Sequence, residues 1–103
     1  MVQMIKVANA SDLPPGKTML VEAAGEAIAL FNIDGSYHAI GNTCTHRGGP
    51  LCEGDVEGTV VTCPWHGATF DITSGSALSP PADERVASYK VHVDGDCIQV
   101  EIP

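Results

Sequence analysis

The sequence predicts an all-β protein, and three observations lead to this fold class. Apolar residues almost never recur at the spacing of an amphipathic helix, short β-type runs recur along the chain, and turn residues separate these runs. The chain has 103 residues, a length that suits one domain. We therefore expect a single domain over residues 1–103.

The expected strands fall into a framework and an insertion. In the framework, Ser11 caps at most one helical turn before two prolines stop it. Asp34-Gly35 matches a two-residue hairpin turn, and Asp94-Gly95 marks a second hairpin near the end of the chain. In chain order, the expected strands cover residues 4–7, 19–23, 27–33, 37–40, 59–62, 68–72, 86–93 and 97–102.

Residues 41–81 differ from the rest of the chain. This stretch is rich in Gly, Pro, Cys and Thr and poor in long strands. It is interrupted only by the two short strands expected at 59–62 and 68–72. We interpret it as a subdomain inserted between framework strands and carrying the function.

Charge and composition exclude several kinds of partner. Lys plus Arg number 5 and Asp plus Glu number 13, so the net charge is 5 − 13 = −8. Nucleic acid and anionic membrane surfaces would repel such a chain. There is no apolar stretch long enough to span a membrane, and residues 1–6 lack the features of a secretory signal. We expect a cytoplasmic protein that binds neither membranes nor nucleic acid.

Two short motifs in the insertion carry metal-binding side chains. Cys44-Thr45-His46 is followed after 16 residues by Cys63-Pro64-Trp65-His66. Each motif offers one thiolate and one imidazole at a spacing that directs both to one point, as soft or borderline metals require. Because both motifs follow expected strands, a hairpin-like pairing would bring the two loops face to face.

Two metal centres are compatible with these four ligands. A single zinc ion accepts two Cys and two His, but zinc sites usually group Cys with Cys and His with His on a unit that contains a helix. One Cys and one His per loop suits a two-iron cluster better. In the cytoplasm, such cysteines indicate a metal or redox site before they indicate disulfides.

The two loops resemble those of the Rieske family. The matching segments are C-T-H-R-G-G-P-L at 44–51 and C-P-W-H-G-A-T-F-D at 63–71. The resemblance implies a small antiparallel β-sandwich with an inserted cluster-binding subdomain. It also implies one 2Fe-2S cluster, with Cys44 and Cys63 on the inner iron and His46 and His66 on the outer iron.

The resemblance also bears on the reduction potential. Two ferric ions, two sulfides and two thiolates sum to zero formal charge, so an added electron meets less repulsion than with four thiolates. In the high-potential branch of the Rieske family, two cysteines joined as a disulfide stand where this chain has Gly49 and Trp65. Residues with hydroxyl groups stand there where this chain has Ala68 and Phe70. Without these groups, we expect a potential at the low end of the Rieske range, near about −150 mV.

The expected function is electron transfer, since the sequence has no nucleotide motif, flavin site or catalytic triad. The chain looks most like the small ferredoxins that pass electrons from a flavoprotein reductase to a terminal oxygenase. We therefore expect a monomer that binds these partners transiently and has no catalytic residues. The alternative function is that of a noncatalytic subunit of an enzyme such as nitrite reductase, and a third possibility is a structural zinc module.

Arg47 and Trp65 are candidates for the face that contacts a redox partner. For Trp65, the alternative is that its ring packs over the cluster.

The remaining candidates have weaker signals. The segment 79–82 matches the proline-containing loop that covers the cluster in the family, or is an ordinary connection. The sequence leaves open whether Cys52 and Cys97 form a disulfide. We expect that neither is a ligand and that Cys97 lies on the less buried face of its strand. His38 and His92 are expected to be strand residues outside the site, and the acidic residues at 55–57 and 83–84 to be solvated.

Overall fold

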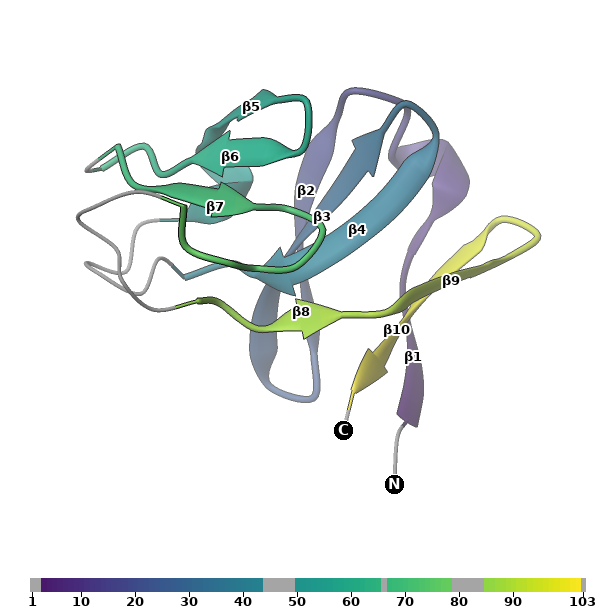
Figure 1. Ribbon diagram of the computed structural model, residues 1–103. Coiled ribbons are helices and arrows are strands. Elements are labelled where there is room, and N and C mark those ends of the chain that lie inside the picture. Colours follow the sequence, from purple (N-terminus) through teal and green to yellow (C-terminus); the bar gives the residue numbers. More distant parts are fainter. Residues whose placement is uncertain (1–2, 44–49, 66, 79–84, 103) are drawn as a thin grey trace.

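The computed structural model describes residues 3–43, 50–65, 67–78 and 85–102. Within these ranges it has ten strands, all paired antiparallel, and two short 3₁₀ turns (Figure 1). None of the described helical turns is long and apolar enough to cross a membrane. The elements are β1 (Gln3–Asn9), η1 (Ala10–Asp12), β2 (Thr18–Ala23), β3 (Glu26–Ile33), β4 (Ser36–Gly41), η2 (Leu51–Glu53), β5 (Asp55–Glu57), β6 (Val60–Thr62), β7 (Thr69–Asp71), β8 (Ser88–Tyr89), β9 (Val91–Asp94) and β10 (Cys97–Ile102).

The strands form three sheets, which confirms the all-β prediction. Two framework sheets have the orders β1-β10-β9 and β2-β3-β4-β8, and a small sheet has the order β5-β6-β7. The small sheet comes between β4 and β8 in sequence and lies beside the framework in Figure 1. The two chain ends lie side by side because β1 pairs with β10, with Gln3 opposite Ile102.

Strand β3 is buried on both faces, and this joins the three sheets. Ile28 and Leu30 point into a core shared with the β1-β10-β9 sheet, which we call the framework core. Ala29 and Phe31 belong to a second core, which we call the junction core and which also includes side chains of the small sheet. A continuous apolar run is what a strand covered on both sides requires. The remaining junction-core residues are Ile40, Leu51, Val61, Cys63, Ala68, Phe70, Ile72 and Val86.

The hairpin turn at Asp34-Gly35 forms as predicted. Ile33 pairs with Ser36, and the two residues between them have positive φ angles of 51° and 92°. Two successive positive φ angles match the right-handed twist of the flanking strands, and Asp followed by Gly tolerates them well. The second hairpin differs by one residue, since Asp94 pairs with Cys97 and the turn residues are Gly95 and Asp96.

Three expectations about local structure were wrong in detail. The expected strand at 86–93 is two strands, because β8 pairs with β4 and β9 pairs with β10 in different sheets. Strand β5 was not predicted, since its acidic residues lack an apolar pattern, yet it pairs with β6. Ser11 does not cap a helical turn; it lies inside η1, and its backbone N–H and hydroxyl both donate to the Asp96 carboxylate.

Gly75 lets the chain pass close to Val86, in the segment that leads into β8. The backbone N–H of Val86 donates to the Gly75 carbonyl oxygen at 2.9 Å. A Cβ at position 75 would lie 2.2 Å from the Val86 carbonyl oxygen. We therefore expect Gly75→Ala to lower the free energy of unfolding by about 3 kcal/mol or more, measured by urea denaturation.

Gly25→Ala is a matched control. Both glycines have a φ of +80°, but a Cβ at Gly25 meets nothing within 4 Å. This control measures the cost of the left-handed backbone alone, about 1 kcal/mol. Equal losses in the two variants would show that the close approach of Gly75 to Val86 has no energetic weight.

Candidate metal centre

The second predicted ligand loop is the connection of the β6–β7 hairpin. Thr62 pairs with Thr69, so the loop occupies residues 63–68. The N–H of Cys63 donates to the Ala68 carbonyl oxygen at 2.7 Å, and the N–H of Gly67 donates to the Cys63 carbonyl oxygen at 3.1 Å. The positive φ of Gly67, 74°, suits this tight return of the chain. The hairpin of β6 and β7 therefore carries Cys63 at the base of its loop.

Cys63 is the one predicted ligand among the described residues. Its side chain is buried, with 1% exposure, and belongs to the junction core together with Ala68 and Phe70. Its thiol is free, so it is available to a metal. A buried, free thiol on a tight hairpin loop is compatible with the inner-iron position that the family resemblance implies.

The base of the first predicted ligand loop is held by hydrogen bonds. Thr43 forms an isolated antiparallel bridge with Pro50, and the N–H of Leu51 donates to the Asn42 carbonyl oxygen at 2.7 Å. Leu51 is fully buried in the junction core, the same core that holds Cys63. The two loops therefore share one apolar support, although they come from different parts of the chain.

Several predicted positions lie outside the described residues. In the ranges that the structure describes, no three His, Cys, Asp or Glu side chains gather as a metal site. Three of the four predicted ligands, one of the two contact-face candidates, one position of the family's disulfide, the lid segment and one acidic pair are not described. These are Cys44, His46, His66, Arg47, Gly49 and the segments 79–82 and 83–84.

The other cysteines and histidines have ordinary positions. Cys52 and Cys97 are both free, so no disulfide joins them. Burial, with a smaller effect of the neighbouring Glu53 carboxylate, raises the pKa of the Cys52 thiol. The alternating burial of β10 leaves Cys97 half-buried, as predicted.

The two described histidines lie on strands. His38 is half-buried on β4, and His92 is exposed on β9. The Nε2 atom of His92 lies 2.6 Å from the Glu101 carboxylate on the neighbouring strand. Both therefore occupy strand positions, as the sequence predicted.

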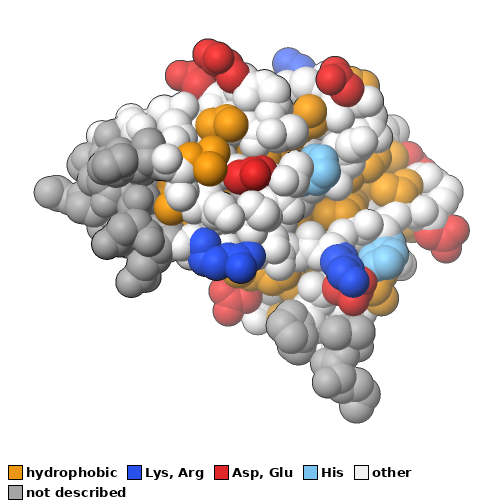
Figure 2. All heavy atoms as spheres, in the orientation of Figure 1, with side chains coloured by type: hydrophobic (Ala, Val, Ile, Leu, Met, Phe, Trp, Pro, Cys, Tyr) orange, Lys and Arg blue, Asp and Glu red, His pale blue; other side chains and the backbone are white. Residues whose placement is uncertain are grey.

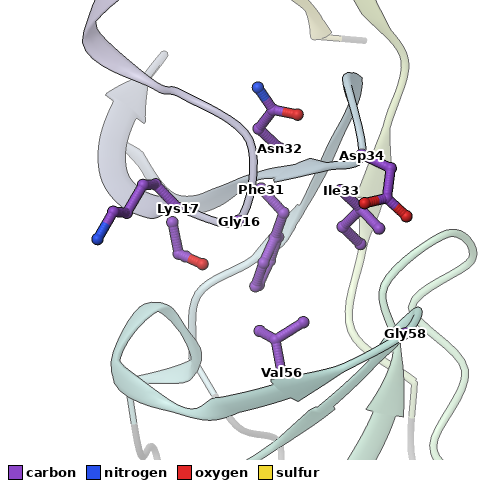
Figure 3. Close-up of a pocket in the computed structure, with 9 residues that line it drawn as sticks. Gly16, Lys17, Phe31, Asn32, Ile33, Asp34, Val56 and Gly58 are labelled. Carbon is purple, nitrogen blue, oxygen red and sulfur yellow. The ribbon is translucent and has the colours of Figure 1, made fainter.

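A groove of about 200 Å³ lies where β5 approaches the framework. Figure 3 shows Phe31 and Val56 pointing toward each other across it, with Lys17 and Asp34 at its margins. Cys63 does not line this groove. The groove is therefore separate from the one predicted ligand that the structure describes.

Two large apolar side chains are exposed beside the second ligand loop. Trp65 is 57% exposed and Leu78 is 51% exposed, so the Trp65 ring does not pack into the junction core. The N–H of Leu78 donates to the carbonyl oxygen of Thr69, the residue after Ala68. On the face in Figure 2, hydrophobic side chains gather at this end of the small sheet. The sequence did not single out Leu78, because only the strand pairing brings it here.

The chain matches known proteins over most of its length. A family model described as the Rieske [2Fe-2S] domain matches residues 3–90. The chain is 36% identical over 94 residues to the 3-phenylpropionate/cinnamic acid dioxygenase ferredoxin subunit of Escherichia coli strain K12, covering 90% of this chain and 88% of that protein.

Solved structures show the same fold. The ferredoxin of carbazole 1,9a-dioxygenase from Nocardioides aromaticivorans IC177 has a TM-score of 0.90 at 29% identity, covering 95% of this chain and 96% of that one. A chain in the complex of reduced oxygenase and oxidized ferredoxin in carbazole 1,9a-dioxygenase has a TM-score of 0.87 at 32% identity, covering 94% and 91%. A putative NADH-dependent nitrite reductase small subunit from Mycobacterium tuberculosis has a TM-score of 0.85 at 28% identity. The match covers 100% of this chain and 97% of that one.

These findings confirm the resemblance inferred from the two loop motifs. The family model spans most of the chain, and the relative from Escherichia coli exceeds one-third identity over nine-tenths of it. The chain belongs to the Rieske [2Fe-2S] domain family.

Proposed function

We propose that this chain is the ferredoxin of an aromatic-ring dioxygenase system, a one-electron carrier and not itself a catalyst. The observation that carries the proposal is the 36% identity, over nearly the whole chain, to a dioxygenase ferredoxin subunit. Its size agrees with this role, since 103 residues provide a scaffold for one centre. When bound, a 2Fe-2S cluster supplies a site that accepts and releases one electron.

The proposed ligands are Cys44, His46, Cys63 and His66, within a cluster-binding subdomain over residues 41–81. Cys63 supports this assignment, because its free thiol is buried at the base of a hairpin loop. Cys44 and Cys63 would bind the inner iron, and His46 and His66 the outer iron. The match to a [2Fe-2S] family model favours this centre over a single structural zinc.

The side chains around Cys63 favour a low potential. Ala68 and Phe70 are fully buried in the junction core and carry no hydroxyl that donates a hydrogen bond toward sulfur. Hydrogen bonds to cluster sulfur stabilise the reduced, more negative state. We therefore place the midpoint near about −150 mV, at the low end of the Rieske range.

The proposed partners are a flavoprotein reductase as donor and a terminal oxygenase as acceptor. A solved complex of ferredoxin with oxygenase, which contains a chain 32% identical to this one, supports the acceptor. Transfer requires a brief encounter over a small interface, and the net charge of −8 would steer the chain toward basic surfaces. We propose that it acts as a cytoplasmic monomer, without binding nucleic acid or membranes.

The second candidate is a noncatalytic Rieske-like subunit of a nitrite reductase. The structural match to such a subunit covers the whole chain and supports this second candidate. Its sequence identity, 28%, is lower than the 36% shared with the dioxygenase ferredoxin subunit. Purification distinguishes the two, since a free carrier elutes alone and a subunit elutes in a fixed complex.

Replacing one proposed histidine ligand should lower the midpoint potential. In His66→Cys, a thiolate replaces a neutral imidazole, so the added electron meets more negative charge. The expected shift is about −100 mV, roughly half the difference between about −150 mV and the −400 mV typical of four-cysteine plant-type ferredoxins. A redox titration followed by visible absorption measures it.

His92→Cys is the control for that titration. His92 is an exposed histidine on β9, outside the proposed ligand set. Its replacement should leave the midpoint unchanged. If His66→Cys also titrates at the wild-type midpoint, His66 is not a ligand.

Leu78 offers a test of the partner-binding face. Leu78→Ser should weaken the interaction with the oxygenase about tenfold, because exposed apolar residues at the centre of an interface contribute most of its affinity. Leu20→Ser is a matched control, since Leu20 is also 51% exposed but lies on β2 of the framework. Steady-state oxygenase turnover against ferredoxin concentration measures the effect. Equal behaviour of the two variants would place the contact face elsewhere.

A further inference from the structure

Asn42 is one of two buried polar side chains in the described part of the chain. It is 8% exposed, and it immediately follows β4, two residues before the proposed ligand Cys44. The other is Asn32, 3% exposed, in strand β3. Burying an amide costs free energy unless its polar atoms are hydrogen-bonded. The partners of Asn42 therefore indicate what its burial accomplishes.

Three hydrogen bonds link Asn42 to both sides of the first ligand loop. Its N–H donates to the Ala27 carbonyl oxygen at 3.0 Å, which ties it to β3. Its carbonyl oxygen accepts from the N–H of Leu51 at 2.7 Å. Its side-chain Oδ1 accepts from the N–H of Cys52 at 2.8 Å. One residue thus connects the start of the loop, the end of the loop and the framework sheet.

The side-chain bond orients the short turn that follows the loop. Leu51 and Cys52 belong to η2, which packs on the junction core through the fully buried Leu51. With the backbone bond alone, η2 is attached to Asn42 at one point. The second bond, through Oδ1, fixes its direction. The loop base is thereby held in register with the core that contains Cys63.

We propose that Asn42 is a positioning residue for the cluster, with its amide oxygen linking the two ends of the segment that carries Cys44 and His46. This inference rests on the proposed function, because it requires those two residues to be ligands. Closing a loop in advance removes conformational entropy that cluster binding would otherwise have to overcome. The residue acts through the loop and need not touch the cluster.

The test compares cluster loss from two asparagine variants. Asn42→Ala removes the bond to Cys52 and leaves both backbone bonds intact. Asn32→Ala removes two side-chain bonds of the other buried asparagine, because Asn32 Oδ1 accepts from the Gly35 N–H at 2.8 Å and its Nδ2 donates to the Leu13 carbonyl oxygen at 2.8 Å. Both variants should lose stability against urea. Iron release to a ferrous chelator from the reduced protein under native conditions should accelerate about threefold to tenfold in Asn42→Ala alone.

Asn42→Asp is the rescue variant. A carboxylate keeps an acceptor oxygen at the same position, so this variant should release iron at the wild-type rate, within about twofold. An electron paramagnetic resonance spectrum of each reduced variant reports whether the remaining cluster is altered. We expect a broadened signal from Asn42→Ala and a wild-type signal from Asn32→Ala.

The outcomes separate this inference from the proposed function. A wild-type protein that contains no iron–sulfur cluster overturns the proposed function and this inference with it. If the wild type contains the cluster but the two alanine variants release iron equally fast, Asn42 is only a structural residue and the inference is wrong. The same conclusion follows if Asn42→Asp releases iron as fast as Asn42→Ala.

Discussion

The burial of β3 on both faces is the constraint on which the rest of the structure depends. One face closes the framework core, and the other places Ala29 and Phe31 in the junction core beneath the small sheet. Cys63 and Leu51 belong to that junction core, so the bases of both ligand loops rest on one rigid apolar support. Close-packed cores resist small displacements. An electron carrier benefits from this, since fixed ligands need little rearrangement when the charge changes.

The chemistry of the family and the architecture of the chain fit together at the end of the small sheet. A hairpin loop with a buried thiol supplies the inner side of the proposed centre, and exposed Trp65 and Leu78 lie beside it. Burial on one side and an exposed apolar surface on the other suit a centre that is shielded by its own protein and approached by a partner. The net charge of −8 would add long-range attraction to a basic partner surface without adding specificity.

Local signals in the sequence were sufficient for much of the fold. The Asp34-Gly35 turn and the alternation in β10 depend on neighbouring residues, and both were predicted. The division of residues 86–93 between two sheets depends on partners far away in the chain, so no local pattern revealed it. The spacing of cysteine and histidine predicted the ligands, of which the structure describes Cys63, buried at the base of the β6–β7 hairpin. The role proposed for Asn42 depends on a bond across ten residues, and only the folded chain shows that bond.

The proposed function requires one cluster that is held by two cysteines and two histidines. Pulsed electron paramagnetic resonance of the reduced protein is the decisive measurement, because it detects nitrogen nuclei coupled to the cluster spin. We expect an average g value below that of four-cysteine ferredoxins and coupling to the nitrogens of two imidazoles. A four-cysteine average g value without strong nitrogen coupling, or a colourless protein with one zinc ion, would contradict it.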